Sequence, residues 1–503
     1  MSSNFRKFIV TTNPQATIEA VQEQTDPTPP SYAQLLEQNV QLRASVQSLL
    51  GQLAKQQQQI LELQARLGKN SANSSKPPSS DGLAKPAPKS LRVPGQRPIG
   101  APKGHSGNTL RQSEIVDIVI EHFGPAQCSA CHSALVEHEV LERRQVLELP
   151  VLRAQVIEHQ RMLSVCTCGA VHAGVFPPDI TAPVQYGSRL KAVCVNLNQQ
   201  HFVPLGRTSE FVADTFGVAV SETSVLAFTH EAAEVLQPIY QQIGQAVQAA
   251  PVVCADETGI RIQGKLQWLH CAVTPSLSYL EHHPKRGLLA IKAIGILPPF
   301  KGTLVHDGLQ SYKQLDCAHS LCNAHHLREL VYVHDNLNEK AFDGWAGEMM
   351  DTLLQGKREV DALGGPLPAQ RMQWYEGRWL ALLDRAERFN PRQEPDDSFT
   401  LKRGKHKHST QFNLLARLRQ YKDDVWRFAT DVGVPFTNNL AEQALRMSKV
   451  RQKVSGCFRT DAGAKTFFAI RSYLQTMRKQ RVNLFDCLVS VFQTNPIKPD
   501  FAV

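Results

Sequence analysis

Three carboxylates stand at the boundaries of short elements that lie far apart in the chain. Asp256 and Asp307 each follow a short apolar run that is typical of a strand. The polar segment Thr437-Asn438-Asn439 predicts the start of a helix, and Glu442 lies one turn into that helix. The intervals are 51 and 135 residues, so a fold that uses all three must close both separations. Two strand-end aspartates and a helical glutamate can then hold two divalent cations, which act on both the attacking and leaving oxygens of a phosphodiester.

The residue that follows Asp256 is also acidic. Successive side chains of a strand face opposite sides of the sheet, so only one of Asp256 and Glu257 can face the cations. The local pattern leaves open which of the two does so.

The helix of Glu442 carries bases at positions that suit a phosphodiester. Arg446, Lys449 and Lys453 follow Glu442 at helical spacing and share its face, and Arg451 adds a further base. These four residues are the candidate DNA-binding side chains. The alternative is an ordinary surface pair between Glu442 and Arg446, worth only about 0.3–0.5 kcal/mol.

Length and charge favour a multidomain protein with a polyanionic partner. A chain of 503 residues exceeds what one hydrophobic core usually supports. The net charge is +9. Residues 69–111 hold eight Lys or Arg against one Asp, and residues 443–482 hold ten against one. Both runs suit DNA, and the alternative for each is a solvated, solubilising surface.

The sequence favours a cytoplasmic, nucleoid-associated bacterial protein. No signal peptide is recognisable, and no apolar run reaches the roughly 20 residues of a membrane span. The 11 cysteines are odd in number and several are isolated in apolar runs, which indicates a reducing compartment. We therefore expect no membrane partner.

The first hundred residues predict a coiled coil between two unstructured segments. Residues 1–30 are polar and expected to be disordered, and residues 69–111 form a basic Pro/Ser-rich linker. Between them, 31–68 repeat apolar residues every seven positions, which predicts a leucine-zipper-like homodimer or higher oligomer through 35–67, or else one amphipathic helix packed on its own chain. The two seams are Leu35, Leu42, Leu49, Gln56, Leu63 and Asn39, Val46, Leu53, Ile60, Leu67.

Residues 112–175 read as a small zinc-finger-like module. Cys128-Ser-Ala-Cys131 and Cys166-Thr-Cys168 supply four thiols, which can close a tetrahedral Zn²⁺ site. The second pair is more tightly spaced than usual, so His172 or His132 could replace a thiol. The alternative is four reduced, unliganded cysteines.

Residues 176–250 read as helices. Segments 207–216 and 221–232 flank Gly217, with Ser221 as an N-cap, which fits a helix-turn-helix. The second segment carries glutamates and lacks Lys and Arg, so a helical hairpin packed on the next domain is the alternative.

Residues 251–460 are expected to form the catalytic core. Apolar runs at 251–255, 266–273, 277–280 and 303–306 predict strands, and 326–430 a helical insertion. Residues 461–503 form a C-terminal helical region. Cys322 and His325 have metal-compatible spacing, but a structural turn near the active site is the favoured interpretation.

At these residues the chain resembles a bacterial DDE transposase of the insertion-sequence 66 family, over nearly its whole length. The resemblance implies a multidomain α+β protein whose RNase H-like mixed α/β core is interrupted by a helical insertion. It also assigns Asp256, rather than Glu257, to a triad with Asp307 and Glu442. The matching motifs are 70–81, Asp256-Glu-Thr-Gly259, 307–312, Cys322-Asn-Ala-His325 and 438–446.

The activity implied is cleavage at insertion-sequence ends and strand transfer into target DNA. Mg²⁺ (or Mn²⁺) would bind Asp256, Asp307 and Glu442, and accessory proteins could take part. Two alternatives remain: an RNase H-like nuclease without strand transfer, and a non-catalytic DNA-binding or assembly protein derived from a transposase.

Overall fold

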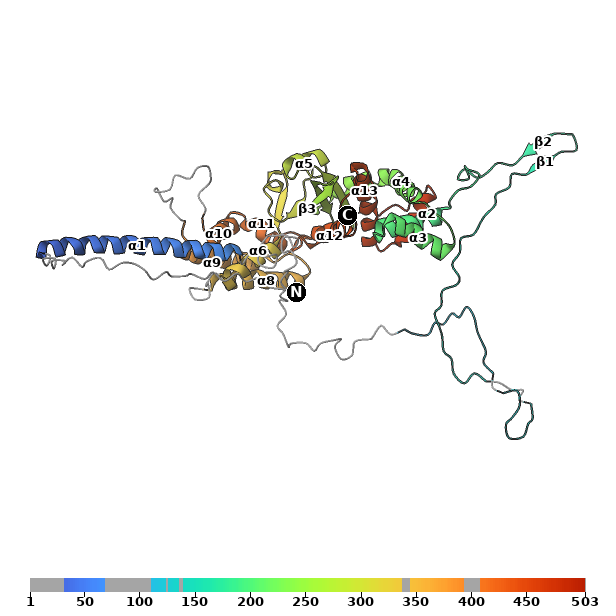
Figure 1. The fold of residues 1–503 in the computed structure, drawn as a ribbon, viewed down its shortest axis with the longest axis horizontal. Coiled ribbons are helices and arrows are strands. Elements are labelled where there is room, and N and C mark those ends of the chain that lie inside the picture. Colours follow the sequence, from blue (N-terminus) through green and yellow to red (C-terminus); the bar gives the residue numbers. More distant parts are fainter. Residues whose placement is uncertain are drawn as a thin grey trace, which may run out of the picture. The chain divides into compact units, whose positions relative to one another are not determined.

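A computed structural model describes residues 31–67, 110–123, 125–134, 139–336, 344–392 and 408–502 (Figure 1). The expected disordered N-terminus and almost all of the basic linker lie outside these ranges, as does the motif 70–81. Contacts divide the chain into two units, Met1–Lys69 and Asn70–Val503. No helix among the described residues is long and apolar enough to cross a membrane.

The first unit contains one long helix, α1 (Tyr32–Leu67). The seam residues whose burial the structure describes are exposed in the single chain: Leu42 by 68% and Leu53 by 60%. A helix that exposes a regular apolar seam is energetically unfavourable on its own, because its hydrophobic side chains remain in water. The helix is therefore confirmed, and its pairing stays a prediction.

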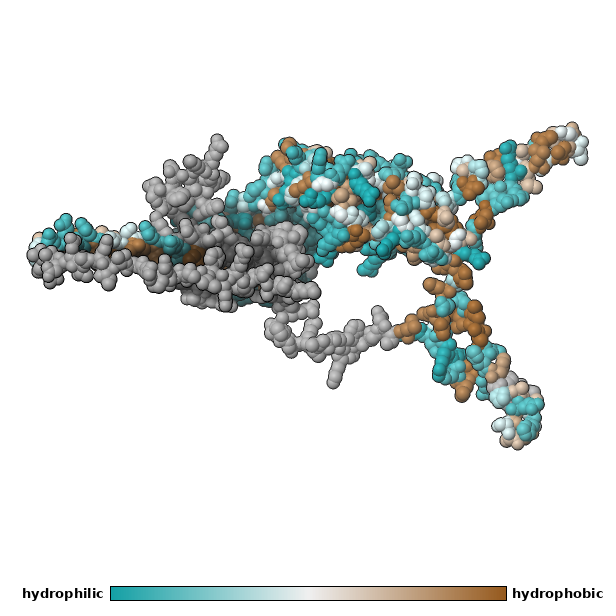
Figure 2. All heavy atoms as spheres, viewed as in Figure 1, coloured by the Kyte–Doolittle hydropathy of each residue, from teal (hydrophilic) through white to brown (hydrophobic). Residues whose placement is uncertain are grey.

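Residues 110–182 are extended and bury almost no side chains where the structure describes them. Apolar side chains such as Leu141 and Val156 are fully or almost fully exposed. Figure 2 shows hydrophobic residues at the surface of the extended segments. The hairpin of β1 (Leu163–Val165) and β2 (Val171–Ala173) encloses the second cysteine pair.

A five-stranded mixed sheet lies at the centre of the second unit, in the order β5-β4-β3-β6-β7. The first three strands of that order are antiparallel, and β3, β6 and β7 are parallel. Backbone N–H groups of the edge strand β5 donate to Ser472 and Thr476 of a covering helix, so this edge is satisfied. The strands are β3 (Val252–Ile262), β4 (Lys265–Val273), β5 (Ser278–His283), β6 (Thr303–His306) and β7 (Ala318–Leu321).

Helices cover both faces of the sheet and form one hydrophobic core on each face. Successive side chains of β3 point alternately into the two cores. Cys254 and Ile260 pack with the insertion helices and α12, whereas Val253 and Ala255 pack with α4, α5 and α14 (Figure 1). The first core contains α6 (Asn323–Asn336), α8 (Trp345–Leu363), α9 (Ala369–Phe389), α10 (Thr410–Gln420), α11 (Lys422–Thr430) and α12 (Asn439–Ser455). The second contains α2 (Ser188–Val195), η2 (Asn196–Gln200), α3 (Leu205–Phe216), α4 (Glu222–Ala249), α5 (Leu288–Ile294), η3 (Tyr312–Gln314) and α14 (Leu484–Phe492); α13 (Asp461–Lys479) contributes to both.

One boundary expected from the sequence is wrong. Asp256 does not close its strand: β3 continues to Ile262 and pairs with β4 over its length. Gln263 and Gly264 both have positive φ, at 52° and 74°, which matches the tight turn that joins twisted antiparallel strands. The strand therefore extends until the hairpin turn, and Asp256 lies within it. By contrast, Asp307 directly follows β6 as expected.

The helices expected around Gly217 are present as α3 and α4. Gly217 adopts φ 71°, and the Ser221 hydroxyl accepts from the Ser224 N–H as an N-cap. α4 is longer than expected, and it buries residues from Val225 to Val247 against the second core. This packing matches the helical hairpin alternative.

Candidate functional site

Asn438 forms hydrogen bonds that link the start of α12 to β3 and to the residue that follows β7. Its side-chain Nδ2 donates to the Ala255 carbonyl at 2.8 Å, and its backbone N–H donates to Cys322 Sγ at 3.1 Å. The side chain is almost fully buried. These bonds join residues 183 and 116 positions apart, so they close the long separation in sequence. They place the first turn of α12, which contains Glu442, beside β3 and the end of β7.

Asp256 lies on the β3 face that α12 covers. Its neighbour across the ladder, Cys271, packs in the first core and donates its thiol to the Ala441 carbonyl at 3.7 Å. Burial raises the pKa of Asp256 well above its usual value, and repulsion from Glu257, Asp307 and Glu442 adds to this. The Asp256 carboxyl therefore lies in an acidic environment to which the other two acids contribute.

Glu257 faces the opposite side of the sheet and has its own partners. Arg286 donates to it twice, at 2.9 and 2.6 Å, and the Tyr312 hydroxyl donates at 2.7 Å. Burial and then repulsion from Asp307 raise the pKa of Glu257, while the bonds from Tyr312 and Arg286 oppose that rise. Arg286 in turn lies over the Trp268 ring. Arg286 thus compensates the charge of Glu257, and the hydrogen bonds from Arg286 and Tyr312 hold its carboxyl group within the fold.

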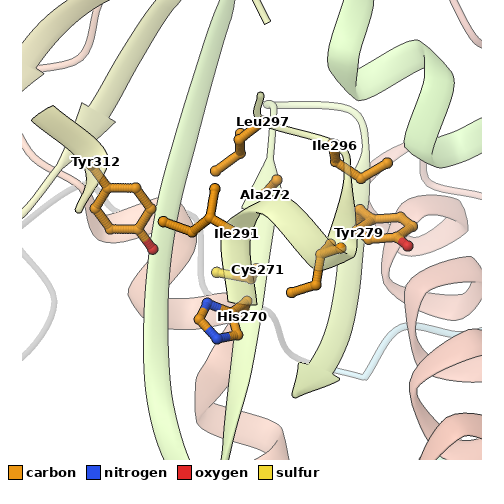
Figure 3. Close-up of a pocket in the computed structure, with 9 residues that line it drawn as sticks. His270, Cys271, Ala272, Tyr279, Ile291, Ile296, Leu297 and Tyr312 are labelled. Carbon is orange, nitrogen blue, oxygen red and sulfur yellow. The ribbon is translucent and has the colours of Figure 1, made fainter. Parts of the chain in front are cut away.

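A small cavity lies between the central sheet and α5 (Figure 3). Its volume is about 20 Å³, which is room for roughly one water molecule. Its lining is mostly aliphatic and aromatic, so it is a packing gap beneath α5. The lining residues include His270, Cys271, Tyr279, Ile291, Leu297 and Tyr312.

Asp307 is exposed at the end of β6, and the turn after it is fixed by two local bonds. Asp307 Oδ1 accepts from the Leu309 N–H at 3.0 Å, and the buried His306 accepts the Gly308 N–H through Nδ1 at 3.0 Å. His306 Nε2 lies 3.2 Å from His319 Nδ1. Burial lowers the pKa of His306 to about 3, so its ring is neutral and supports the turn as a hydrogen-bonding group.

Glu442 lies closer to two other side chains, Cys322 and His325, than the three acids lie to one another. Among the described residues, ligand atoms of Cys322, His325 and Glu442 all lie within 4.8 Å of one another. The oxygens of Asp256, Asp307 and Glu442 interact electrostatically but do not form such a group. Arg328 of α6 pairs with Glu442 at 3.7 Å.

The four candidate DNA-binding bases of α12 fall into two kinds. Arg446 and Lys453 are exposed. Lys449 donates to the Gly259 carbonyl, and Arg451 lies 4.6 Å from the Phe467 ring centroid and bonds to the Asn198 carbonyl. Burial lowers the pKa of Arg451 to about 10. The structure thus engages two of the bases within the fold and leaves two facing solvent.

The two cysteine pairs each form a compact turn but are not gathered together. The Cys128 N–H donates to Ser133, and the Cys166 N–H donates to Ala170. Hydrogen bonds, chiefly from Ser133 and from the Cys168 backbone, lower the pKa values of Cys131 and Cys166 and so favour thiolates. The two pairs do not come together as one group of ligands among the described residues, so zinc binding by Cys128, Cys131, Cys166 and Cys168 stays a prediction.

Sequence reasoning missed the roles of Asn438 and Arg328. The local sequence predicts only a helix start at Asn438, whereas its hydrogen bonds reach residues far away in the chain. The Cys-x-x-His spacing of Cys322 and His325 was noted, but nothing local links it to Glu442. Their proximity follows from the packing of α12.

Comparison with known proteins agrees with this architecture. The model of the Transposase IS66 family matches residues 183–466, and a family of unknown function (DUF6444) matches residues 26–111. An uncharacterized protein, y4qI, of Sinorhizobium fredii is 23% identical over 419 residues, covering 79% of this chain and 75% of that protein. The family match spans more than half of the chain and includes the whole sheet and α12. The chain belongs to the Transposase IS66 family.

Proposed function

We propose that this transposase cleaves DNA at insertion-sequence ends and transfers the cut strand into target DNA by a two-metal DDE mechanism. The observation that carries the proposal is the acidic environment of Asp256, to which Asp307 and Glu442 contribute from separate elements. The strand order, with three antiparallel strands followed by two parallel ones, supports an RNase H-like core.

The donor set fits hard divalent cations. Three carboxylates on rigid elements supply oxygen ligands of the kind that Mg²⁺ and Mn²⁺ prefer. Burial, and then repulsion from neighbouring acids, raises the pKa of Asp256, and a cation would offset that repulsion. Bound Mg²⁺ would supply an activated water or 3′-hydroxyl and would stabilise the leaving oxygen.

The protein's own residues orient the reactants. Asp256 is held within β3, Asp307 by its turn, and Glu442 by the bonds of Asn438. Exposed Arg446 and Lys453 follow Glu442 on α12, where they would contact the DNA backbone. The same site would act first in cutting and then in joining.

Two further parts of the proposal concern assembly. The exposed seam of α1 would pair two protomers, so that two ends are held in one complex. The cysteine pairs of residues 112–175 would bind Zn²⁺ and give that extended region a local core. Replacing Leu42 and Leu49 with Lys should shift the protein toward monomer in sedimentation; an unchanged oligomer would reject the zipper.

The central experiment incubates the full chain and Mg²⁺ with the DNA that flanks its own gene. Strand-transfer products that require Asp307 support the proposal. Cleavage without joined products would indicate a nuclease, and specific binding with neither product would indicate an assembly protein. The matched control is Asp316→Asn, because Asp316 lies near Asp307 in sequence and its side chain is 93% exposed.

A further inference from the structure

Cys322, His325 and Glu442 form a group whose chemistry differs from that of the three acids. The group combines a sulfur, an imidazole nitrogen and a carboxylate oxygen, all within 4.8 Å of one another. Mg²⁺ is bound by oxygen, whereas thiolate and imidazole favour zinc-class ions. We propose that these three side chains form a binding site for a zinc-class divalent metal ion, separate from the cysteine pairs of residues 112–175.

The backbone holds the first two ligands in a suitable position. Cys322 directly follows β7, and His325 lies in the first turn of α6, with its N–H donating to the Cys322 carbonyl at 3.1 Å. One end of this segment is fixed by the Asn323 N–H, which donates to the Phe436 carbonyl at 3.1 Å. The ligands therefore sit on rigid elements, and a tetrahedral zinc site, with donor atoms roughly 3.5 Å apart, needs only small side-chain adjustments.

Two atoms of the group have environments that suit a bound ion. Cys322 Sγ accepts the Asn438 N–H at 3.1 Å, the kind of outer hydrogen bond that orients a ligand atom. His325 Nδ1 is buried and has no hydrogen-bond partner among the described residues. A buried nitrogen without a partner is costly, because its hydration is lost without replacement.

Charge also balances at this site. Binding releases the Cys322 thiol proton to solvent, and the resulting thiolate and the Glu442 carboxylate together match the charge of one divalent ion. The carboxylate keeps a second oxygen that can face Arg328, already 3.7 Å away. Three protein ligands leave a fourth position for water or a substrate oxygen.

The test is Co²⁺ binding to the full chain, since Co²⁺ reports thiolate ligation through a sulfur-to-metal absorption band. The cysteine pairs would also bind Co²⁺, so all variants carry Ser at positions 128, 131, 166 and 168, which lie outside the packed core. We expect this background protein to bind one Co²⁺ with a single-thiolate band. No such band would overturn the proposal.

Ligand variants locate the ion. Cys322→Ser should abolish the band, and His325→Ala and Glu442→Gln should each raise the Kd for Co²⁺ by about 100-fold while retaining the band at saturation. Cys317→Ser is the matched control, since Cys317 lies in the same segment but outside the group, and its band should be unchanged. Thermal unfolding of each variant checks the fold, and a band that survives Cys322→Ser in a folded protein would reject the site.

The site shares Glu442 with the proposed triad, and one consequence rests on the proposed function. Zinc should inhibit the Mg²⁺-dependent reaction, and His325→Ala should raise the inhibiting concentration by about 100-fold relative to its own zinc-free activity. Absence of inhibition with an intact Co²⁺ band would remove this coupling and leave the metal site standing. Full activity of Asp307→Asn would instead reject the triad.

Discussion

Asp256 and Glu257 are adjacent acids on one strand, yet they face environments of opposite character. Glu257 is almost fully buried and receives three hydrogen bonds, two from Arg286 and one from Tyr312. Asp256 receives one backbone bond, from Glu257, and is repelled by the acids around it. The difference teaches that burial alone does not mark a reactive carboxylate. An acid whose charge the protein leaves uncompensated is the one available to a cation.

The largest effect that distinguishes the two faces of β3 should come from removing an acid on the side that α12 covers. Asp307→Asn should lower Mg²⁺-dependent strand transfer by about 10³-fold or more, because several kcal/mol of charge stabilisation in the transition state depend on the metal ions. Product yield over time on end-bearing DNA measures this. Asp316→Asn should match the unaltered protein, and an equal loss in both variants would point to damage unrelated to the site.

Removing the acid on the other face should affect stability instead. Glu257→Ala leaves the buried Tyr312 hydroxyl without its acceptor, so the free energy of unfolding should fall by about 2–3 kcal/mol. Urea denaturation measures the loss, and activity per folded molecule should stay within a few-fold of the original. If Glu257→Ala abolished activity in a protein that remained folded, the assignment of the two faces would be wrong.

Asp256→Asn should stabilise the metal-free protein in a pH-dependent manner. The folded state keeps the Asp256 proton to a higher pH than the unfolded chain, so the free energy of unfolding falls as pH rises from the ordinary value near 3.8 through the raised pKa. The amide removes this loss, so we expect a gain in the free energy of unfolding at pH 8 and almost none at pH 4. Denaturation in EDTA at both pH values tests it; a gain of equal size at both would exclude titration as its cause.

Substitutions of the bases on α12 test which of them contact DNA and which only support the fold. Arg446→Ala and Lys453→Ala should each reduce the slope of log K against log salt by about 1, since each removes one phosphate contact. Lys449→Met should leave this slope unchanged and lower stability, because Lys449 bonds within the fold. Fluorescence anisotropy at several salt concentrations measures the slopes. Equal slopes in all three variants would place the DNA elsewhere.

The sequence predicted the elements whose signal is local. Apolar runs indicated four of the five central strands, and the heptads indicated α1. β7 was missed because Ala-His-Ser-Leu is short and mixed, and it is a strand only through pairing with β6. α5 was also missed, since a seven-residue apolar run reads equally as a strand.

The site was only partly predictable for the same reason. Residue types and positions at element ends made the three acids candidates, and alternation along a strand left a choice between Asp256 and Glu257. The choice between the two faces depends on Tyr312, Arg286 and α12, which are distant in sequence. The bonds of Asn438 likewise join distant segments, and no local pattern encodes them.

The placement of α12 has a consequence for the order in which the protein is made. Glu442 follows Asp256 by 186 residues, so at roughly 5–20 residues per second a ribosome needs about 9–37 s to complete the set. During that time the hairpin of β3 and β4 can form, but Asn438 has not yet been synthesised. A nascent or prematurely ended chain would therefore contain two acids of the proposed triad and lack the third.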